Sequence, residues 1–593
     1  MDLGAGSGPA TGSGPGASAG SSHQWAVLWA LLTCFGWLLP NHYYPWITFH
    51  TDAWITWSFA IGGTALLLTS AASVPWHRLS VLTACLIAVP VLQWFAGLII
   101  FQGQAWLTSS FLLGLLLCVL VGAQSEEVRP EFAIDALFLA IGLACVASVG
   151  IQMRQWIWQG EPDLWVVPLA ELRPFGNLAQ PNQMATLHLW GIIATAWGFH
   201  KGKFGRGAAL AIVLFLLFGI ALTQSRTAIV AIFMLLGMAV WWRGLWRSPA
   251  RVIGAITGLA LYFWACLLGL GSISHALLLD KPFSAMERIG GHDIRWEVYK
   301  LFVDAALQRP WFGYGWSPVT PAQFAVAERH PALGGVFQQS HNLFLDFVLW
   351  LGIPLGLAVS ACLVAWYVAR IKRVASVKDA LLVMFISVVG LHAMLELPLH
   401  YAYMLFPTGL VVGALNVKLG ARVVGRSSRS SALALLCAGV LLLAALTRDY
   451  FLIEADFLAL RFERAYNLPP KEPPRILVLT QLSEFMKMGR STARAGMSQE
   501  ELDRFRDVAD AFPSPSNLYL YTAALALNGR VEEARLRVRK SQKTMLPGAY
   551  EQMGDAWADQ SKKHNALASV PWLPPDDDEP SPRPKGLPAT DHP

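Results

Sequence analysis

Thirteen apolar stretches recur along the chain, and most have the length of about 20 residues that an α-helix needs to cross a lipid bilayer. Inside a bilayer no water satisfies the backbone N–H and C=O groups, so these groups must bond to one another. The stretches lie near residues 24–41, 53–71, 79–98, 105–123, 132–151, 184–199, 207–222, 227–242, 251–272, 343–369, 379–397, 403–418 and 430–447. We therefore expect an all-α, polytopic membrane protein with 12–13 transmembrane helices.

The composition supports this interpretation and is unlike that of a soluble protein. Of the 593 residues, 54% are hydrophobic, only 14% are charged, and 25 are Trp. All seven cysteines lie inside apolar stretches and none shows CxxC spacing. Neither a metal site nor a disulfide framework is therefore indicated.

Basic residues are distributed unequally between alternate loops. One set of short loops holds sixteen Lys and Arg residues, whereas the alternate short loops hold only Arg154, Arg173 and Arg226. Cytoplasmic loops carry the excess of positive charge, so the sixteen-residue side is predicted to be cytoplasmic. In a bacterial inner membrane, loops 152–183 and 272–342 would then face the periplasm together with the C-terminal part of the chain.

Composition also divides the chain into parts. Residues 518–534 resemble one tetratricopeptide-type helix pair that turns at Gly529, although the 34-residue period is not repeated. The predicted parts are a disordered tail (1–22), a transmembrane region (23–447), a periplasmic helical domain (448–564) and a Pro-rich, acidic, disordered tail (565–593).

His341 lies where a polar segment becomes an apolar stretch, in residues 338–354. It ends the longest polar loop within the apolar part of the chain, which places it at a water–membrane boundary. Free histidine titrates near ~6.5, so the side chain can exchange a proton at neutral pH. It could equally be an interfacial residue that caps a helix or bonds to a lipid headgroup, and spacing alone leaves both interpretations open.

Three arginines on the predicted outer side suit a phosphate. Arg226 lies between two apolar stretches, where an arginine is costly unless it pairs or binds an anion. Arg288 and Arg295 flank a glycine pair in loop 272–342, and guanidinium groups bind phosphate oxygens bidentately. Snorkelling of Arg226 to a lipid phosphate, and an ordinary solvated helix start at the other two, are the alternatives.

Amide side chains gather before the apolar stretch that begins near residue 184. Gln180, Asn182 and Gln183 could bind sugar hydroxyls or a pyrophosphate. Capping of a helix start, by Asn182 especially, would explain the same pattern.

The outward turn 396–403 adds three further candidates for substrate binding. They are Glu396, His400 and Tyr401. An aromatic belt at the membrane interface would explain the tyrosines of this turn but not Glu396.

These motifs together resemble the O-antigen ligase/polymerase superfamily of bacterial membrane glycosyltransferases. The resemblance rests on residues 340–346 with Gly352 and Pro354 beyond them, on residues 225–227, and on Arg295, Pro310 and 313–315. Within the superfamily, residues 40–46 and 175–186 resemble the protein O-oligosaccharyltransferases, also called pilin glycosylation ligases. The resemblance covers roughly residues 24–545.

The resemblance implies packed transmembrane helices of the GT-C kind and an inverting, metal-independent transfer without a cofactor. A preassembled glycan would move en bloc from an undecaprenyl-pyrophosphate-linked donor to Ser or Thr hydroxyls of periplasmic proteins or pilin. His341 would take the proton from the acceptor hydroxyl or orient it. Arg226, Arg288 and Arg295 would neutralise the leaving pyrophosphate. The partners are then the lipid-linked donor, the acceptor protein and membrane lipids, with no nucleic acid.

Other functions are kept as alternatives. An O-antigen ligase would use lipid A–core as the acceptor, and an O-antigen polymerase would extend a polysaccharide. A transporter of lipid-linked sugars should show ionisable residues deep in several spans or inverted repeats, and the sequence shows neither. A nonenzymatic assembly platform would leave the outward histidine and arginines unexplained.

Overall fold

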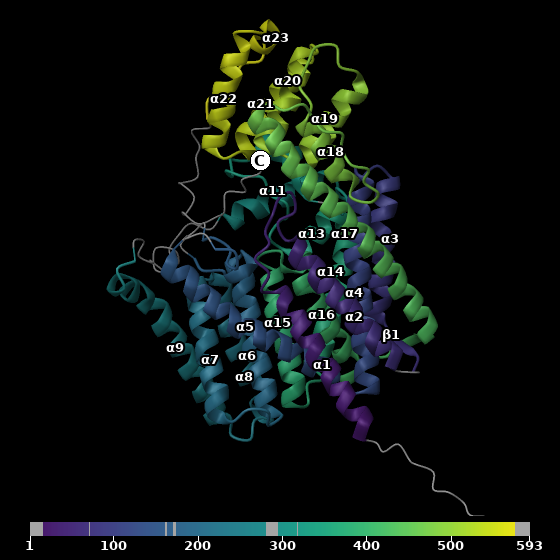
Figure 1. Cartoon of the computed structure of the whole chain (residues 1–593), viewed down its shortest axis with the longest axis vertical. Coiled ribbons are helices and arrows are strands. Elements are labelled where there is room, and N and C mark those ends of the chain that lie inside the picture. Colours follow the sequence, from purple (N-terminus) through teal and green to yellow (C-terminus); the bar gives the residue numbers. More distant parts are fainter. Residues whose placement is uncertain are drawn as a thin grey trace, which may run out of the picture.

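A computed structural model describes residues 16–69, 72–159, 163–169, 173–279, 294–316 and 318–575, and within them the chain is almost entirely helical (Figure 1). The apolar region contains α1 (Gly16–Gly36), α2 (Phe49–Thr69), α3 (Arg78–Phe95), α4 (Gln102–Val128), α5 (Phe132–Trp158), α6 (Pro181–His200), α7 (Arg206–Thr223), α8 (Arg226–Trp241), α9 (Pro249–Ala276), α13 (Leu343–Leu351), α14 (Ile353–Ile371), α15 (Val377–Ala393), α16 (Ala402–Lys418) and α17 (Arg429–Tyr466). Helices α11 (Arg295–Gln308) and α12 (Thr320–Val326) lie in the large loop before His341.

The expected helical, multi-pass membrane architecture is confirmed. Seven described helices, α3, α4, α5, α7, α9, α14 and α17, are long and apolar enough to cross a membrane, and α8 and α16 are apolar but shorter. The other apolar stretches also contain helix. The total of 12–13 crossings stays a prediction.

One expected span, 343–369, is wrong because the helix breaks at Gly352. This residue has a φ of 82°, a conformation that favours glycine, and Pro354 follows within the first turn of α14. A Cβ at Gly352 would overlap the carbonyl group of Trp311, so only glycine lets the large loop approach this closely. The loop then bonds to both sides of the break, from Tyr314 N to Leu349 O at 2.7 Å and from Ile353 N to Pro310 O at 2.6 Å.

The structure also contains one small sheet that the all-α expectation left out. Strand β1 (Val74–His77) pairs antiparallel with β2 (Val423–Ser427). The pair lies at the end of the molecule opposite the C-terminal helices (Figure 1). Arg426 of β2 donates to both carboxylate oxygens of Glu127 at 2.8 and 3.0 Å, which fixes the sheet to the end of α4. Strands of four and five residues leave too short a pattern for the sequence to predict.

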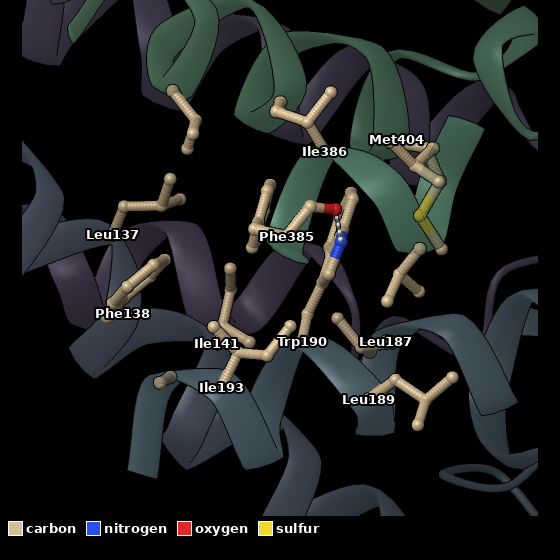
Figure 2. Close-up of a cluster of buried hydrophobic side chains, with 14 of the residues drawn as sticks. Leu137, Phe138, Ile141, Leu187, Leu189, Trp190, Ile193, Phe385, Ile386 and Met404 are labelled. Atoms are coloured by element: carbon tan, nitrogen blue, oxygen red, sulfur yellow. Dashed lines mark hydrogen bonds between the residues drawn. The ribbon is translucent and has the colours of Figure 1, made fainter. Parts of the chain in front are cut away.

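The main core joins the helices that carry the candidate site. Figure 2 shows Trp190 of α6 lying against Phe385 of α15, with the rings stacked 4.1 Å apart between centroids. Trp190 Nε1 also donates to Phe385 O at 3.0 Å, which satisfies the polar edge of a buried indole. Helices α4 and α16 pack through glycines, since a Cβ at Gly413 would overlap Val119 O. The stacked rings and the Trp190–Phe385 hydrogen bond thus hold α6 against α15.

The C-terminal helices lie together at the other end of the molecule (Figure 1). They are α18 (Thr480–Gly489), α19 (Gln499–Ala511), α20 (Pro515–Leu527), α21 (Val531–Thr544), α22 (Pro547–Ser561) and α23 (Asn565–Ala568). The predicted helix pair turning at Gly529 is confirmed by α20 and α21. The boundary predicted at 447–448 falls inside α17, which runs without a break from the apolar region toward these helices.

Candidate active site

Glu396, in the turn between α15 and α16, is the point where several predicted residues meet. Gln180 Nε2 donates to Glu396 Oε2 at 3.0 Å, and Asn182 Nδ2 donates to Oε1. Arg295 Nη2, at the start of α11, lies 3.4 Å from Oε1, and His392 Nε2 lies 3.1 Å from Oε2. We call these five residues the Glu396 cluster.

The carboxyl group of Glu396 is ionised at neutral pH. Burial by itself would raise its pKa, because the charged form loses water. The hydrogen bond and charge of His392, and the charges of Arg295 and His341, outweigh burial and lower the pKa to about 2. The cluster is thus a carboxylate surrounded by amide, imidazole and guanidinium groups, all of which can also bind an oxygen-rich substrate.

His392 is a site residue that the sequence interpretation missed. It is fully buried in α15, and its Nδ1 lies 2.9 Å from Thr186 Oγ1 of α6. The predicted span 379–397 hid it among apolar neighbours. The signal that could have revealed it is its spacing of four residues from Glu396, which puts both side chains on one face of a helix.

Arg173 is a second residue missed from the site, although it was noted as an exception to the charge rule. It is 8% exposed, and its Nε donates to Thr223 O at 2.9 Å. Its Nη2 lies 3.5 Å from Asn182 Oδ1. Arg226 begins α8 three residues after Thr223, so the turn that holds Arg226 is tied to the Glu396 cluster through Arg173 and Asn182.

Buried amides hold the segment that leads into α6. Gln155 Oε1 accepts from the backbone N–H groups of Phe175 and Gly176 at 3.0 and 2.8 Å. Asn177 Nδ2 donates to Leu38 O at 2.7 Å. These bonds fix a loop whose backbone would otherwise be unsatisfied inside the protein.

The capping role suggested for Asn182 belongs to Gln180 instead. Gln180 Oε1 accepts from Gln183 N at 2.7 Å, as the N-cap of α6. Both Gln180 and Asn182 keep their amide nitrogens on Glu396. The side-chain Oε1 of Gln183 accepts from the Tyr403 hydroxyl.

The backbone around His341 is held on both sides. Ser340 N donates to Asp346 Oδ1 at 2.8 Å, and the Tyr299 hydroxyl donates to His341 O at 3.3 Å. Asn342 is the N-cap of α13. Its Oδ1 accepts from Phe344 N at 3.1 Å and from Leu345 N at 3.2 Å. The alternative in which His341 itself caps the helix is therefore wrong.

His341 has a left-handed backbone with a φ of 63°. A non-glycine residue in this region costs on the order of 1–3 kcal/mol and persists only where its surroundings impose it. The same turn lies beside the segment that carries Glu396, because Asn342 Nδ2 donates to Met394 O at 3.4 Å and the charge of His341 acts on Glu396. The structure thus brings His341, Arg295 and Glu396 into one site.

His400 and Tyr401 are not members of the Glu396 cluster, but Tyr401 lies near it: burial and, to a lesser extent, the charges of Asp52 and Glu396 raise the pKa of its hydroxyl. His400 packs its ring against Trp350, with centroids 5.5 Å apart, and Tyr401 stacks on Tyr403 at 5.2 Å. Arg288 lies outside the described residues. Within the described ranges, no group of three or more His, Cys, Asp or Glu side chains could hold a metal ion.

A large cavity adjoins the His341 turn and also reaches Met394 and Leu397, which lie on either side of Glu396 in the chain. Its volume is about 1020 Å³. It extends from α3, α4 and α14–α16 up to α18 and the connection between α19 and α20. Gln338 and Gln339, just before the turn, line it, and so do His400 and Tyr401.

Comparisons with known proteins match the regions that build the site. The family model described as O-antigen ligase matches residues 211–360, and the family model described as protein glycosylation ligase matches residues 174–197. The model described as virulence factor membrane-bound polymerase, C-terminal, matches residues 380–556. Together these segments contain every residue of the Glu396 cluster, and His341.

Two relatives from Acinetobacter baylyi extend the likeness over most of the chain. A general O-oligosaccharyltransferase is 27% identical over 526 residues, which are 86% of this chain and 91% of the relative. A ComP-specific O-oligosaccharyltransferase is 24% identical over 329 residues, which are 55% of this chain and 59% of that relative. The chain belongs to the O-antigen ligase family and is an O-oligosaccharyltransferase within it.

Proposed function

We propose that this chain moves a preassembled glycan from an undecaprenyl-pyrophosphate-linked donor to Ser or Thr hydroxyls of periplasmic proteins or pilin. The observation that carries the proposal is the meeting of His341, Arg295 and Glu396 at one turn. Similarity to a general O-oligosaccharyltransferase along 91% of its length supports a protein acceptor over lipid A–core or a growing polysaccharide.

The acceptor oxygen attacks the anomeric carbon of the first sugar, and the bond from that carbon to the pyrophosphate oxygen breaks. The electron pair leaves with undecaprenyl pyrophosphate, and attack from the opposite face inverts the anomeric carbon. His341 takes the hydroxyl proton or orients the hydroxyl. The negative charge that develops on the leaving group is neutralised by Arg226, Arg288 and Arg295, so no metal ion is needed.

Glu396 positions groups for this reaction rather than reacting itself. Its oxygens hold Arg295, Asn182 and His392 in place, in the way that supporting carboxylates orient the side chains that do chemistry. Because it stays ionised, it also offsets part of the arginine charge when the donor is absent. Gln180 and Asn182 would bind sugar or phosphate oxygens on the same side.

The proposed orientation places the site, the large loop and the C-terminal helices in the periplasm. It is supported by the way the predicted cytoplasmic loops gather at one carboxylate. Lys201, Lys378 and Lys418, from three separate loops, lie 3.0, 2.8 and 3.2 Å from the oxygens of Glu131. Reporter fusions at 320 and 480 should therefore indicate periplasm, and fusions at 203 and 375 cytoplasm.

Intact mass measurement of periplasmic proteins tests the function. Cells with this chain should carry a glycan mass on acceptor proteins that is absent from cells without it, while lipopolysaccharide is unchanged. A change confined to lipopolysaccharide would show an O-antigen ligase, and a change in polysaccharide length a polymerase. Purified chain with a lipid-linked donor and a Ser-containing acceptor should then reproduce the transfer.

A further inference from the structure

The cavity beside the His341 turn joins the apolar helices to the C-terminal helices. The walls within the apolar region come from α3, α4 and α14–α16 and are mostly apolar. Toward the C-terminal helices, the walls include Gln104 in the first turn of α4, Trp316 of the large loop and Phe485 of α18. Residues 511–514, from the end of α19 to the start of α20, complete this part. A ligand that enters beside the C-terminal helices can therefore reach the His341 turn.

The described walls of the cavity offer a phosphate no basic side chain to pair with. None of its described lining residues is Lys, Arg or Glu. Asp52 is already occupied, since its Oδ1 accepts from Ala402 N at 2.7 Å and its Oδ2 from Thr48 Oγ1 at 2.8 Å. Burial lowers the pKa of His400 to about 4, so this imidazole is neutral at pH 7. The described lining of the cavity thus suits an uncharged ligand, and Arg295, which pairs with Glu396, is not among the lining residues.

Four buried polar atoms of the cavity wall have no hydrogen-bond partner in the described part of the chain. They are Gln339 Oε1, Trp350 Nε1, His400 Nε2 and Gln481 Oε1. A buried polar group left in this state costs about 1–3 kcal/mol. The set includes an N–H donor and carbonyl acceptors, so it matches a ligand that carries both kinds of group. A peptide backbone does, and a polyprenyl chain does not.

We propose that the cavity receives the acceptor as an extended, uncharged protein segment, and that its hydroxyl reaches His341 from this side. The proposal rests on the proposed function and adds the acceptor path and its selectivity. The acceptor then lies against the uncharged described walls of the cavity, and the anionic donor head lies with Arg295 at the Glu396 cluster. A charged residue beside the modified Ser or Thr is therefore disfavoured, because the described lining has no basic side chain and its one acidic side chain, Asp52, is already hydrogen-bonded.

A matched pair of substitutions in the first turn of α4 tests this selectivity. Gln104→Glu keeps the side-chain shape and adds one negative charge to the cavity wall, where Gln104 lies. Gln102→Glu adds the same charge in the same turn, on an exposed residue that is not part of the wall. Purified full-length protein is assayed with lipid-linked donor and two acceptors that differ only in Ala or Lys beside the modified Ser.

Gln104→Glu should raise kcat/KM for the Lys acceptor relative to the Ala acceptor by roughly 5–10-fold, a typical effect of one newly paired charge. The donor KM should not change, and Gln102→Glu should leave the ratio as in wild type. An altered donor KM with an unchanged acceptor ratio would assign the cavity to the donor's chain or glycan and overturn the proposal. Absence of transfer by wild type would count against the proposed function instead.

A second pair keeps the test decisive if Gln104→Glu does not insert. Ser514 lines the cavity and caps α20, with its Oγ accepting from Asn517 N at 3.2 Å. Ser514→Asp retains a capping oxygen and adds a charge, and Ser498→Asp does the same at the cap of α19, away from the cavity. Acceptor binding measured without donor should shift toward the Lys acceptor in Ser514→Asp alone, and equal shifts in both variants would refute the acceptor path.

Discussion

Two glutamates at opposite ends of the membrane region have similar acidity and different surroundings. Burial would raise the pKa of each, and hydrogen bonds and nearby charges lower both to about 2. Glu131 is bonded to three lysines, whereas Glu396 is bonded to amides, a histidine and an arginine. A strongly shifted pKa therefore does not by itself mark an active site.

The difference lies in what the partners can do besides bonding to the carboxylate. The lysines come from three loops and join them as point charges, which is a structural clamp. The partners of Glu396 are planar amide, imidazole and guanidinium groups beside a strained histidine turn. They can bind phosphate and hydroxyl oxygens in defined directions, so the substitutions below should affect transfer at one end and stability at the other.

The largest effect is expected at His341, which has no counterpart near Glu131. We predict that His341→Ala reduces transfer by about 10²–10⁴-fold, because general acid–base assistance is lost. The protein should still insert, since the ring contact that the substitution removes within the described residues is a single one, with Phe337 at 5.9 Å between centroids. Transfer is measured with purified protein, lipid-linked donor and a Ser-containing acceptor.

His341→Gln then separates the two possible roles of the histidine. Glutamine can hydrogen-bond a hydroxyl but cannot accept its proton at neutral pH. Partial activity in Gln with none in Ala would show orientation rather than base catalysis. Wild-type activity in His341→Ala would remove this residue from the mechanism.

Arg295 comes next, since it links the carboxylate to the expected leaving group. We predict that Arg295→Ala lowers transfer by roughly 10²–10³-fold, the usual loss when a group that stabilises developing charge is removed. Arg295→Lys should recover only part, because a point charge replaces a planar fork. The control is Arg329→Ala, an exposed residue of the same loop whose Nη1 lies 3.9 Å from Asp304. Equal losses in Arg295→Ala and Arg329→Ala would mean a general disturbance of the loop.

The comparison is tested most directly by making the same substitution at both glutamates. We predict that Glu396→Gln lowers transfer by about 10–10²-fold, since misplacement of a supported group by ~1 Å has an effect of this order. Glu131→Gln should leave transfer within about twofold and lower the melting temperature instead. Kinetics and thermal unfolding are measured on both proteins in one detergent. A large loss of activity in Glu131→Gln would show that the two ends are coupled.

The smallest effect is the dependence of stability on pH. The folded pKa of Glu131 lies below the ordinary glutamate value of 4.5, so its stabilising contribution is complete above pH ~4.5 and is lost as the pH falls toward 2. Melting temperature should therefore fall by a few °C over this window, at roughly 2–4 °C per kcal/mol. The part of this slope due to Glu131 should vanish in Glu131→Gln. An identical slope in both proteins would show that Glu131 does not contribute to it.

Local patterns predicted the helices and part of the site. Apolar length placed the helices, and the polar-to-apolar change placed His341 at its turn. Patterns could not show that Glu396 meets Gln180, because the two lie 216 positions apart. His392 was missed because its apolar neighbours are what a membrane helix requires, and Arg173 because its partner Thr223 comes from a distant turn. Convergence of this kind depends on packing between helices and not on the residues next to each other in sequence.

The break at Gly352 also determines what happens when the thickness of the bilayer changes. A continuous helix over 343–371 would tilt as one rod to match the hydrocarbon layer, and His341 would change its depth with it. Here α13 is tied by its backbone to the large loop, through Tyr314 and Leu349, while α14 begins afresh at Ile353. We expect α14 to absorb hydrophobic mismatch by tilting at the glycine, so that the histidine keeps its height above the membrane in thick and thin lipid alike.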